Sequence, residues 1–182
     1  MANFLKDKSV LVTGGTGSIG SALVQKLRQK NCKVIRVFSN DENGLYNLSE
    51  TIKEDKDVSF QQKMKKNKIR FILGDVRELN RCLNATKNID IVIHAAALKH
   101  VPICEFNPKE AYRTNFIGTK NLIAASKKNK VKKFLFISTD KVVKPISVMG
   151  KTKKIAESLV IKSNSKSNTN FSCIRFGNII GS

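Results

Sequence analysis

A glycine-rich stretch near the N-terminus has the residue types and spacing of a phosphate-binding loop. Residues 13–20 read TGGTGSIG and fit the pattern G-x-G-x-x-G from Gly15 onward. Gly14 and Gly15 are expected to allow a positive φ in a tight turn, Gly17 to let the backbone approach a pyrophosphate, and Gly20 to let a helix pack closely on its strand. An apolar run precedes the stretch and a helical period follows it, so the free N–H groups of the helix N-terminus are expected to face phosphates. The predicted cofactor-binding residues here are Thr13, Gly14, Gly17, Ser18, Ile19 and Gly20.

Two further stretches follow apolar runs in the way expected of ligand-binding residues. Asp75 and Val76 follow one run, and the small residues Ala95, Ala96 and Ala97 follow another. Ligands of open α/β sheets bind at the carboxyl ends of the strands, so all five are predicted to contact a cofactor. Asp75 could equally be the N-cap of the next helix. His94, just before the alanines, is interpreted as a structural histidine.

The end of the second predicted strand bears on the choice of cofactor. A dinucleotide fold often places an acid there for the ribose 2′-hydroxyl, and this chain has Ser39. Without a carboxylate to repel it, a 2′-phosphate becomes tolerable, and Arg36 or a nearby Lys could pair with it. The sequence therefore favours NADP, with Ser39 as a cofactor-binding residue. Asp41 and Glu42 keep NAD possible.

The elements that must position these residues alternate between short β-branched runs and helical periods. We therefore predict one NAD(P)-binding domain over residues 1–182, a Rossmann-like, doubly wound parallel sheet of about six strands with helices on both faces. Residues 53–68 are polar and without period, and are interpreted as a surface connection. The predicted strands are 10–13, 34–38, 69–73, 89–94, 134–138 and 171–176, and the predicted helices are about 18–30, 43–54, 78–86, 105–129 and 148–163.

Composition narrows the functional classes. The chain has 182 residues, 41% of them hydrophobic, and a formal net charge of +20. The basic residues are mostly Lys and are spread along the chain, which favours a solvated basic surface over nucleic-acid binding. The four cysteines lack metal-ligand spacing, so free buried thiols and no metal are predicted. A short polar N-terminus and the lack of a long apolar run predict a cytoplasmic protein that does not insert into membranes.

Several motifs together give a more specific resemblance. They are residues 13–20, GDVR at 74–77, HAAALKHVP at 94–102, TN at 114–115, STDK at 138–141 and RFGN at 175–178. This set resembles the extended short-chain dehydrogenases/reductases, and more narrowly the CapD-like UDP-N-acetylglucosamine 4,6-dehydratases of polysaccharide biosynthesis. The resemblance covers nearly the whole chain. Its narrow signals are LKHVP at 98–102 and TDK at 139–141.

The resemblance implies a reaction and a set of site residues. Such enzymes oxidise a sugar at C4 with bound NADP or NAD, eliminate water across C5 and C6, and return the hydride to C6. Elimination needs an acid for the leaving hydroxyl and a base for the C5 proton, and Asp140 and Lys141 suit these roles, with Thr139 bonding to the sugar. The resemblance also implies a UDP-sugar substrate and a homo-oligomer in the complete enzyme. It assigns Lys153 to catalysis and to the cofactor ribose, and Lys99, His100 and Asn178 to the substrate.

This chain departs from the superfamily pattern in two respects. The catalytic Tyr belongs four residues before Lys153, and Met149 stands there instead. A thioether cannot take a proton, so Lys141, Lys153 or a water remain open as the group that deprotonates the C4 hydroxyl. Family members also continue into a smaller C-terminal domain that encloses the sugar. We therefore expect this chain to be the cofactor half, lacking the substrate domain and with little activity alone.

Other functions remain open on the sequence. Met149 and the expected missing domain would fit a non-catalytic NAD(P)-binding module. A nucleotide-sugar epimerase of the same superfamily is a second alternative. A basic nucleic-acid-binding protein is the least favoured, because the chain has no aromatic residues interleaved with its basic ones and no recognised binding motif.

Overall fold

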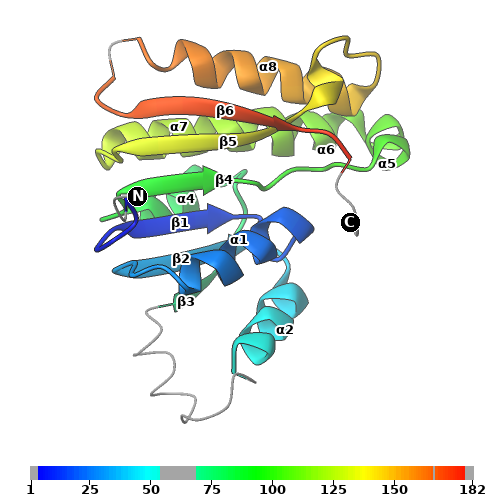
Figure 1. Ribbon diagram of the computed structural model, residues 1–182. Coiled ribbons are helices and arrows are strands. Elements are labelled where there is room, and N and C mark those ends of the chain that lie inside the picture. The colour runs from blue at the N-terminus through cyan, green and yellow to red at the C-terminus, as the bar shows by residue number, and fades with distance from the viewer. Residues whose placement is uncertain (1–3, 54–68, 166, 179–182) are drawn as a thin grey trace.

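The computed structural model describes residues 4–53, 69–165 and 167–178, which are built around a six-stranded parallel sheet (Figure 1). The strand order is β3-β2-β1-β4-β5-β6, and every neighbouring pair is parallel. The chain runs outward from β1 to β3, returns to the middle and continues from β4 to β6, so the order reverses beside β1. The strands are β1 Ser9–Thr13, β2 Val34–Ser39, β3 Ile69–Leu73, β4 Ile91–His94, β5 Lys133–Thr139 and β6 Asn170–Phe176. The predicted Rossmann-like sheet is confirmed.

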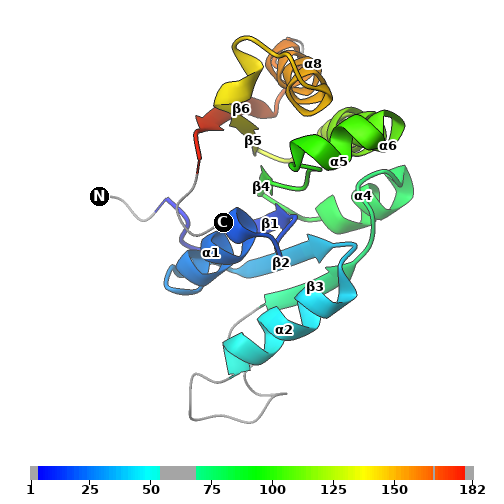
Figure 2. The same cartoon turned by 90° about the vertical axis from the view of Figure 1, so that its right-hand side faces the viewer.

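Helices cover both faces of the sheet (Figure 2). The apolar residues of α1 and α2 pack on one face, and those of α4, α7 and α8 pack on the other. The helices are α1 Ser18–Arg28, α2 Glu42–Lys53, α4 Leu79–Thr86, α5 Val101–Phe106, α6 Pro108–Tyr112, the π-helical turn η1 Arg113–Ile117, α7 Gly118–Lys128, the 3₁₀ turn η2 Asp140–Val142 and α8 Val148–Lys162. Among the described helices none is long and apolar enough to cross a membrane.

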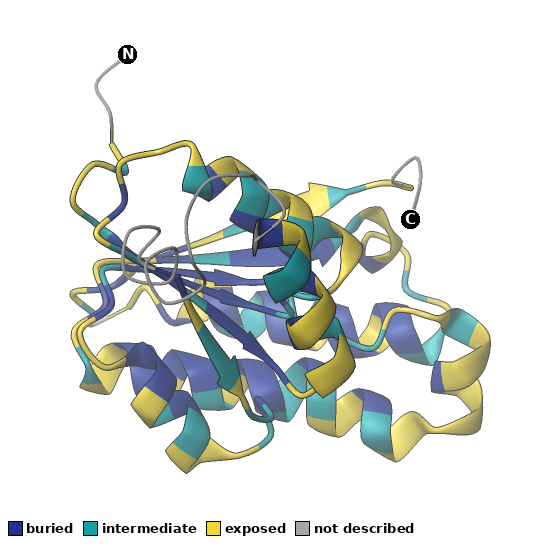
Figure 3. Ribbon diagram, turned by 90° about the horizontal axis from the view of Figure 1, so that it is seen from below, coloured by how far each residue is buried: buried dark blue, intermediate teal, exposed yellow. Residues whose placement is uncertain are grey.

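The central strands are apolar on both faces, as a sheet covered on both sides requires. In β1, Val10 and Val12 belong to the core beneath α1 and α2, while Leu11 belongs to the opposite core. All three side chains are fully buried. Figure 3 shows the central strands as largely buried ribbon and many exposed residues on the helices around them.

The prediction of one continuous helix over residues 105–129 is wrong, because several helical segments occupy this region. Helical structure begins at Val101, stops at Asn107 and resumes at Pro108. Asn107 has φ −129° and ψ 58°, because the residue before a proline is pushed out of the helical region. The π-helical turn η1 then joins α6 to α7. The predicted surface connection lies outside the described residues, apart from Lys53, which ends α2.

Candidate functional site

A cavity of about 610 Å³ opens where the strands reach their carboxyl ends. Segments that follow all six strands line it, which agrees with ligand binding at the point where the strand order reverses. Most of the predicted site residues meet here. Those that line the cavity are Gly14, Gly17, Ser18, Ile19, Gly20, Ser39, Asp75, Val76, Ala95, Ala96, Ala97, Lys99, His100, Thr139, Lys141, Lys153 and Asn178.

The glycine loop has space where a phosphate would lie. Gly14 has φ +64°, and a Cβ added there would lie 2.6 Å from the Cα of Ala96, so only glycine fits. The nearest atom to a Cβ added at Gly17 would be the carbonyl oxygen of Gly14, 3.5 Å away. Gly17 is the N-cap residue of α1 and has no side chain that could bond to the first N–H groups of the helix. The N–H groups at the start of α1 are therefore available to an anion.

Two of the predicted glycine roles need correction. Gly15 is not among the residues with positive φ in the described chain; a side chain there would instead collide with Val37 of β2. A side chain on Gly20 would strike the carbonyl of Gly14, so this glycine allows close packing of α1 against the loop itself rather than against a strand.

Thr13 was predicted to contact the cofactor, but it does not line the cavity. It is fully buried, and its Oγ1 lies 2.7 Å from Nδ1 of His94. The other ring nitrogen of His94 lies 2.9 Å from Oγ1 of Thr119. Burial, with the nearby charge of Lys153, lowers the pKa of His94 to about 3, so the ring is neutral. Thr13 and His94 therefore support the floor of the site, and the structural interpretation of His94 is confirmed.

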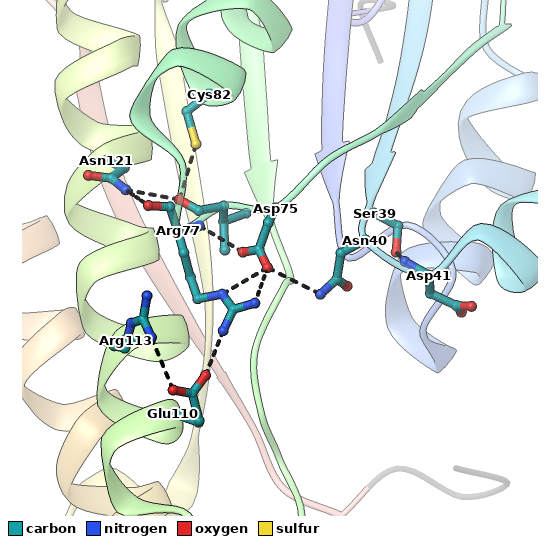
Figure 4. A network of polar contacts seen from close by, with 10 residues as sticks. Ser39, Asn40, Asp41, Asp75, Arg77, Cys82, Glu110, Arg113 and Asn121 are labelled. Carbon is teal, nitrogen blue, oxygen red and sulfur yellow. Dashed lines mark hydrogen bonds and ion pairs between the residues drawn. The ribbon is translucent and has the colours of Figure 1, made fainter.

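Three charged side chains that line the cavity, Asp75, Arg77 and Glu110, form a network with Arg113 (Figure 4). Arg77 donates from Nε to Asp75 at 2.8 Å and from Nη1 to Glu110 at 2.6 Å, and its Nη2 lies 2.6 Å from Asp75. Arg113 also pairs with Glu110. Although burial opposes ionisation, the hydrogen bonds and charge of Arg77 hold the pKa of Asp75 below its ordinary value. Asp75 is not the N-cap of α4, because that position is Glu78.

The end of β2 differs from the sequence-based expectation in one respect. β2 ends at Ser39, one residue beyond the predicted strand 34–38. Ser39 Oγ lies 3.0 Å from Oγ1 of Thr16 and accepts a bond from the Asp41 N–H. Asp41 lines the cavity as well. Arg36, which was expected to pair with a 2′-phosphate, donates to the carbonyls of Ala85 and Lys87 at the end of α4 and does not line the cavity.

The predicted acid–base residues follow β5 directly. Thr139 Oγ1 donates to Asp140 Oδ1 at 2.9 Å, and Lys141 Nζ lies 3.5 Å from the same oxygen and 3.2 Å from Asn178 Oδ1. The hydrogen bond from Thr139, with the charge of Lys141, lowers the pKa of Asp140. Asp140 itself does not line the cavity and is 58% exposed, so it reaches the site through Thr139 and Lys141.

Lys153 lies on α8 one turn after Met149, and both line the cavity. Lys153 is only 6% exposed; its Nζ donates to the carbonyl of Ile137 at 2.6 Å and lies 4.2 Å from the Phe136 ring centroid. These two contacts favour the ammonium, but burial outweighs them and lowers the pKa of Lys153 to about 7. The amine is thus neutral in a large share of molecules near pH 7.

A buried carboxylate lies one turn further along α8. Glu157 is 3% exposed and accepts hydrogen bonds from Ser138 Oγ at 2.7 Å and from Nη2 of Arg175 at 2.6 Å. The Arg175 hydrogen bond, against the opposing effect of burial, lowers the pKa of Glu157. Because Ser138 precedes Thr139, this cluster fixes the end of β5 against α8 and β6.

The segment that carries Lys99 and His100 is held in place by hydrogen bonds between Asn115 of η1 and Leu98. The Asn115 side chain accepts from the Leu98 N–H at 2.8 Å and donates to the Leu98 carbonyl at 3.1 Å and to Thr152 at 3.0 Å. It is 1% exposed. Asn115 thereby ties this segment to α8.

Sequence reasoning missed several polar residues of the cavity. Thr16 and Arg77 lie within the motifs at 13–20 and 74–77, so these motifs already indicated that both residues are near the site. Glu110 comes from α6, and nothing in its local sequence indicates the site. The polar lining residues not predicted are Thr16, Asn40, Arg77, Glu110, Thr114 and Ser138.

The described residues give no support to a metal centre. Within residues 4–53, 69–165 and 167–178, no three His, Cys, Asp or Glu side chains gather in a way that could hold a metal ion. Cys32, Cys82 and Cys104 are buried free thiols as predicted, whereas Cys173 is only partly buried.

The sheet order, the glycine loop and the cavity at the strand ends define the class of dinucleotide-binding α/β folds. Residues 10–182 match the family model described as "Polysaccharide biosynthesis protein". The match covers nearly the whole chain, and the chain belongs to this family.

Curated relatives carry more than one functional name. An "Uncharacterized membrane protein" of Methanocaldococcus jannaschii is 48% identical over 100% of this chain and 52% of its own length. A "UDP-glucose 4-epimerase" of Rickettsia bellii is 42% identical over 97% and 50%. A "UDP-N-acetylglucosamine 4,6-dehydratase (inverting)" of Campylobacter jejuni is 38% identical over 96% and 50%. The chain spans about half the length of these relatives.

Solved structures agree with the fold. The X-ray structure of Pen from Bacillus thuringiensis is 41% identical with a TM-score of 0.89, over 98% of this chain and 54% of that one. MoeE5 in complex with UDP-glucose and NAD is 26% identical with a TM-score of 0.72, over 92% and 52%. The second structure binds a nucleotide sugar and a nicotinamide dinucleotide together.

Proposed function

We propose that the protein carrying this chain is a nicotinamide dinucleotide-dependent 4,6-dehydratase that converts UDP-N-acetylglucosamine into a UDP-4-keto-6-deoxy sugar for polysaccharide biosynthesis. The observation that carries this proposal is the Asp140–Lys141 pair, with Oδ1 and Nζ 3.5 Å apart and with Lys141 lining the same cavity as the glycine loop. An elimination needs an acid and a base side by side.

The residues that would hold the dinucleotide are those of the glycine loop, the β2 and β3 ends and the three alanines after β4. The open space at Gly17 and the uncapped start of α1 fit a pyrophosphate. The bound nicotinamide would supply hydride acceptance at C4 of the sugar and hydride return at C6. Ser39 at the end of β2 favours NADP as the dinucleotide.

The acid–base pair requires one proton shift before it can act. The lowered pKa of Asp140 makes it a carboxylate in the free chain, whereas a general acid must carry a proton. We propose that a bound sugar desolvates the pair, and that burial then favours the neutral forms over the ion pair. Transfer of one proton from Lys141 Nζ to Asp140 gives a carboxylic acid for the leaving hydroxyl and an amine for the C5 proton.

Lys153 is the group we propose to deprotonate the C4 hydroxyl. Met149, in the place of the expected Tyr, has no proton-accepting oxygen. Lys153 lies one turn away, lines the same cavity, and has a pKa of about 7, so its neutral amine is available near neutral pH. Lys99, His100 and Asn178 also line the cavity, and we propose that they bind the nucleotide sugar.

A UDP-sugar 4-epimerase is the second candidate, and the 42% identity to a protein of that name favours it. An epimerase oxidises and reduces C4 alone and has no elimination step. It therefore has no use for an acid and a base beside C5 and C6, which is why we place it second. Cytoplasmic location and homo-oligomeric assembly stay predictions.

Mass spectrometry of the product separates the candidates. The full polypeptide that carries this chain is incubated with UDP-N-acetylglucosamine and dinucleotide in D₂O. A dehydratase yields a product lighter by one water and carrying deuterium at C5. An isomer of unchanged mass indicates an epimerase, and tight dinucleotide binding without any sugar conversion indicates a non-catalytic module.

A further inference from the structure

We propose that the edge of the sheet opposite the cavity is a docking surface for an anionic lipid bilayer. This surface, called the basic edge, consists of residues 6–8, 30–33, 87–90 and 127–133, which lie at the starts of β1, β2, β4 and β5. Figure 1 shows the strand arrowheads pointing away from this edge. The role of the basic edge goes beyond the chemistry proposed for the cavity and does not depend on it.

Backbone hydrogen bonds hold the four segments of the basic edge side by side. The Lys33 N–H donates to the carbonyl of Lys8 at 2.8 Å. The Asp90 N–H donates to the carbonyl of Ser9 at 2.9 Å, and the Asp90 carbonyl accepts from the Lys132 N–H at 2.9 Å. Because β2, β1, β4 and β5 are neighbours in the sheet, lysines that are far apart in the sequence gather at one end of it.

The basic edge has a large excess of positive charge. It contains ten lysines and two aspartates, a net charge of +8, and nine of the ten lysines are exposed. One of the two carboxylates, Asp90, is already paired with Lys132 at 2.9 Å. Although burial opposes its ionisation, the hydrogen bond from Ser9 and the charges of Lys132 and Lys8 hold the pKa of Asp90 below its ordinary value.

The cavity at the opposite edge is nearly balanced in charge, because three carboxylates and four basic side chains line it. Helix dipoles explain only part of the difference. Lys127 and Lys128 end α7, where a cation complements the negative end of the helix. Lys6, Lys8 and Lys133 are outside the helices, and like charges gathered there repel one another. An anionic surface would relieve that repulsion.

The side chains of the basic edge suit a bilayer better than a nucleic acid. All its cations are lysines, which act as point charges on flexible stems, whereas the planar fork of Arg that reads base edges does not occur in these four segments. Phe4 is 53% exposed, and Lys133 Nζ lies 4.8 Å from its ring centroid. Lysines together with an exposed aromatic side chain are typical of proteins that lie in the headgroup region. A protein docked in this way holds its cavity on the side away from the bilayer.

Sedimentation of the full 182-residue chain with unilamellar vesicles tests the docking surface. Vesicles of phosphatidylcholine alone are compared with vesicles of equal parts phosphatidylcholine and phosphatidylglycerol. Two variants each lose four exposed lysines. The edge variant combines Lys6→Gln, Lys33→Gln, Lys128→Gln and Lys133→Gln, and the control variant combines Lys109→Gln, Lys120→Gln, Lys144→Gln and Lys151→Gln.

We expect the parent chain to bind the anionic vesicles, to ignore those of phosphatidylcholine alone, and to be released by added salt. At about fivefold in affinity per lysine near the headgroups, the edge variant should bind about a hundredfold or more weakly than the parent. The control variant should keep most of the affinity. Circular dichroism checks that each variant is folded. If the edge variant does not fold, Lys33→Gln and Lys151→Gln make the same comparison with single changes.

Lack of binding to the anionic vesicles would overturn the docking surface, and so would equal losses in the edge and control variants. Duplex DNA of the same concentration is the third arm. Binding of DNA that is tighter than binding of vesicles at the same salt concentration, and that is lost in the edge variant, would assign the basic edge to nucleic acid instead. None of these results bears on dinucleotide binding in the cavity, which calorimetry measures separately.

Discussion

Replacing Lys153 by Met should change how the stability of the fold depends on pH. Burial lowers the pKa of Lys153 from 10.5 to about 7. Between pH 7 and pH 10.5 the unfolded chain holds a proton on Lys153 that the folded chain lacks, so the free energy of unfolding rises with pH. Below pH 7 both states hold this proton, and Lys153 adds no pH dependence to the free energy of unfolding. At about 1.4 kcal/mol per pKa unit, the side chain costs the fold on the order of 5 kcal/mol near pH 7.

The difference in the free energy of unfolding between Lys153→Met and the parent protein measures the cost of burying Lys153. Lys153→Met should be more stable than the parent near pH 7, and the gap should close as the pH rises toward 10.5. Urea unfolding at intervals of pH measures it. Lys151→Met, which removes the same charge from an exposed position of α8, is the control and should run parallel to the parent. Parallel curves for Lys153→Met as well would refute a strongly lowered pKa.

Four further variants test other parts of the site. Gly17→Val should abolish dinucleotide binding measured by calorimetry with little change in melting temperature, because the space at Gly17 is open; retained affinity would contradict the phosphate role. Asp140→Asn and Lys141→Ala should each lower turnover of the complete enzyme by about a hundredfold or more while cofactor affinity stays near that of the parent. Near-normal activity in either would reject the acid–base assignment. Arg175→Leu should destabilise the fold in urea unfolding, because buried Glu157 would keep Ser138 as its one side-chain hydrogen-bond donor among the described residues. Unchanged stability would show that Glu157 does not depend on Arg175.

The sheet could be predicted from sequence because its strands are buried on both faces. A short apolar run such as that of β1, which follows a polar N-terminus and precedes a glycine loop, is typical of a buried strand. The broken helix before α7 could not be read from its apolar period alone. Pro108 marks the interruption, but the π-helical turn after it follows from tertiary contacts such as those of Asn115 with Leu98.

The site was predictable where its residues directly follow strands. Parallel strands end at one edge, so Asp75, Ala96 and Thr139 come together from distant parts of the sequence. The roles of single side chains were less accessible. Thr13 was expected to face the cofactor, but its partner is His94, and Arg36 was expected at the ribose, but it binds the end of α4. These outcomes depend on hydrogen-bond partners 81 positions away for Thr13 and 49 positions away for Arg36, which no local pattern encodes.

We propose that a dinucleotide and an acid–base pair act together on a nucleotide sugar. The most direct measurement is the mass and deuterium content of the product formed from UDP-N-acetylglucosamine in D₂O by the full polypeptide, compared with its Lys141→Ala variant. We expect a product that has lost one water and gained one deuterium at C5, formed by the parent and nearly absent with the variant. A product of unchanged mass, formed equally well by both proteins, would contradict it.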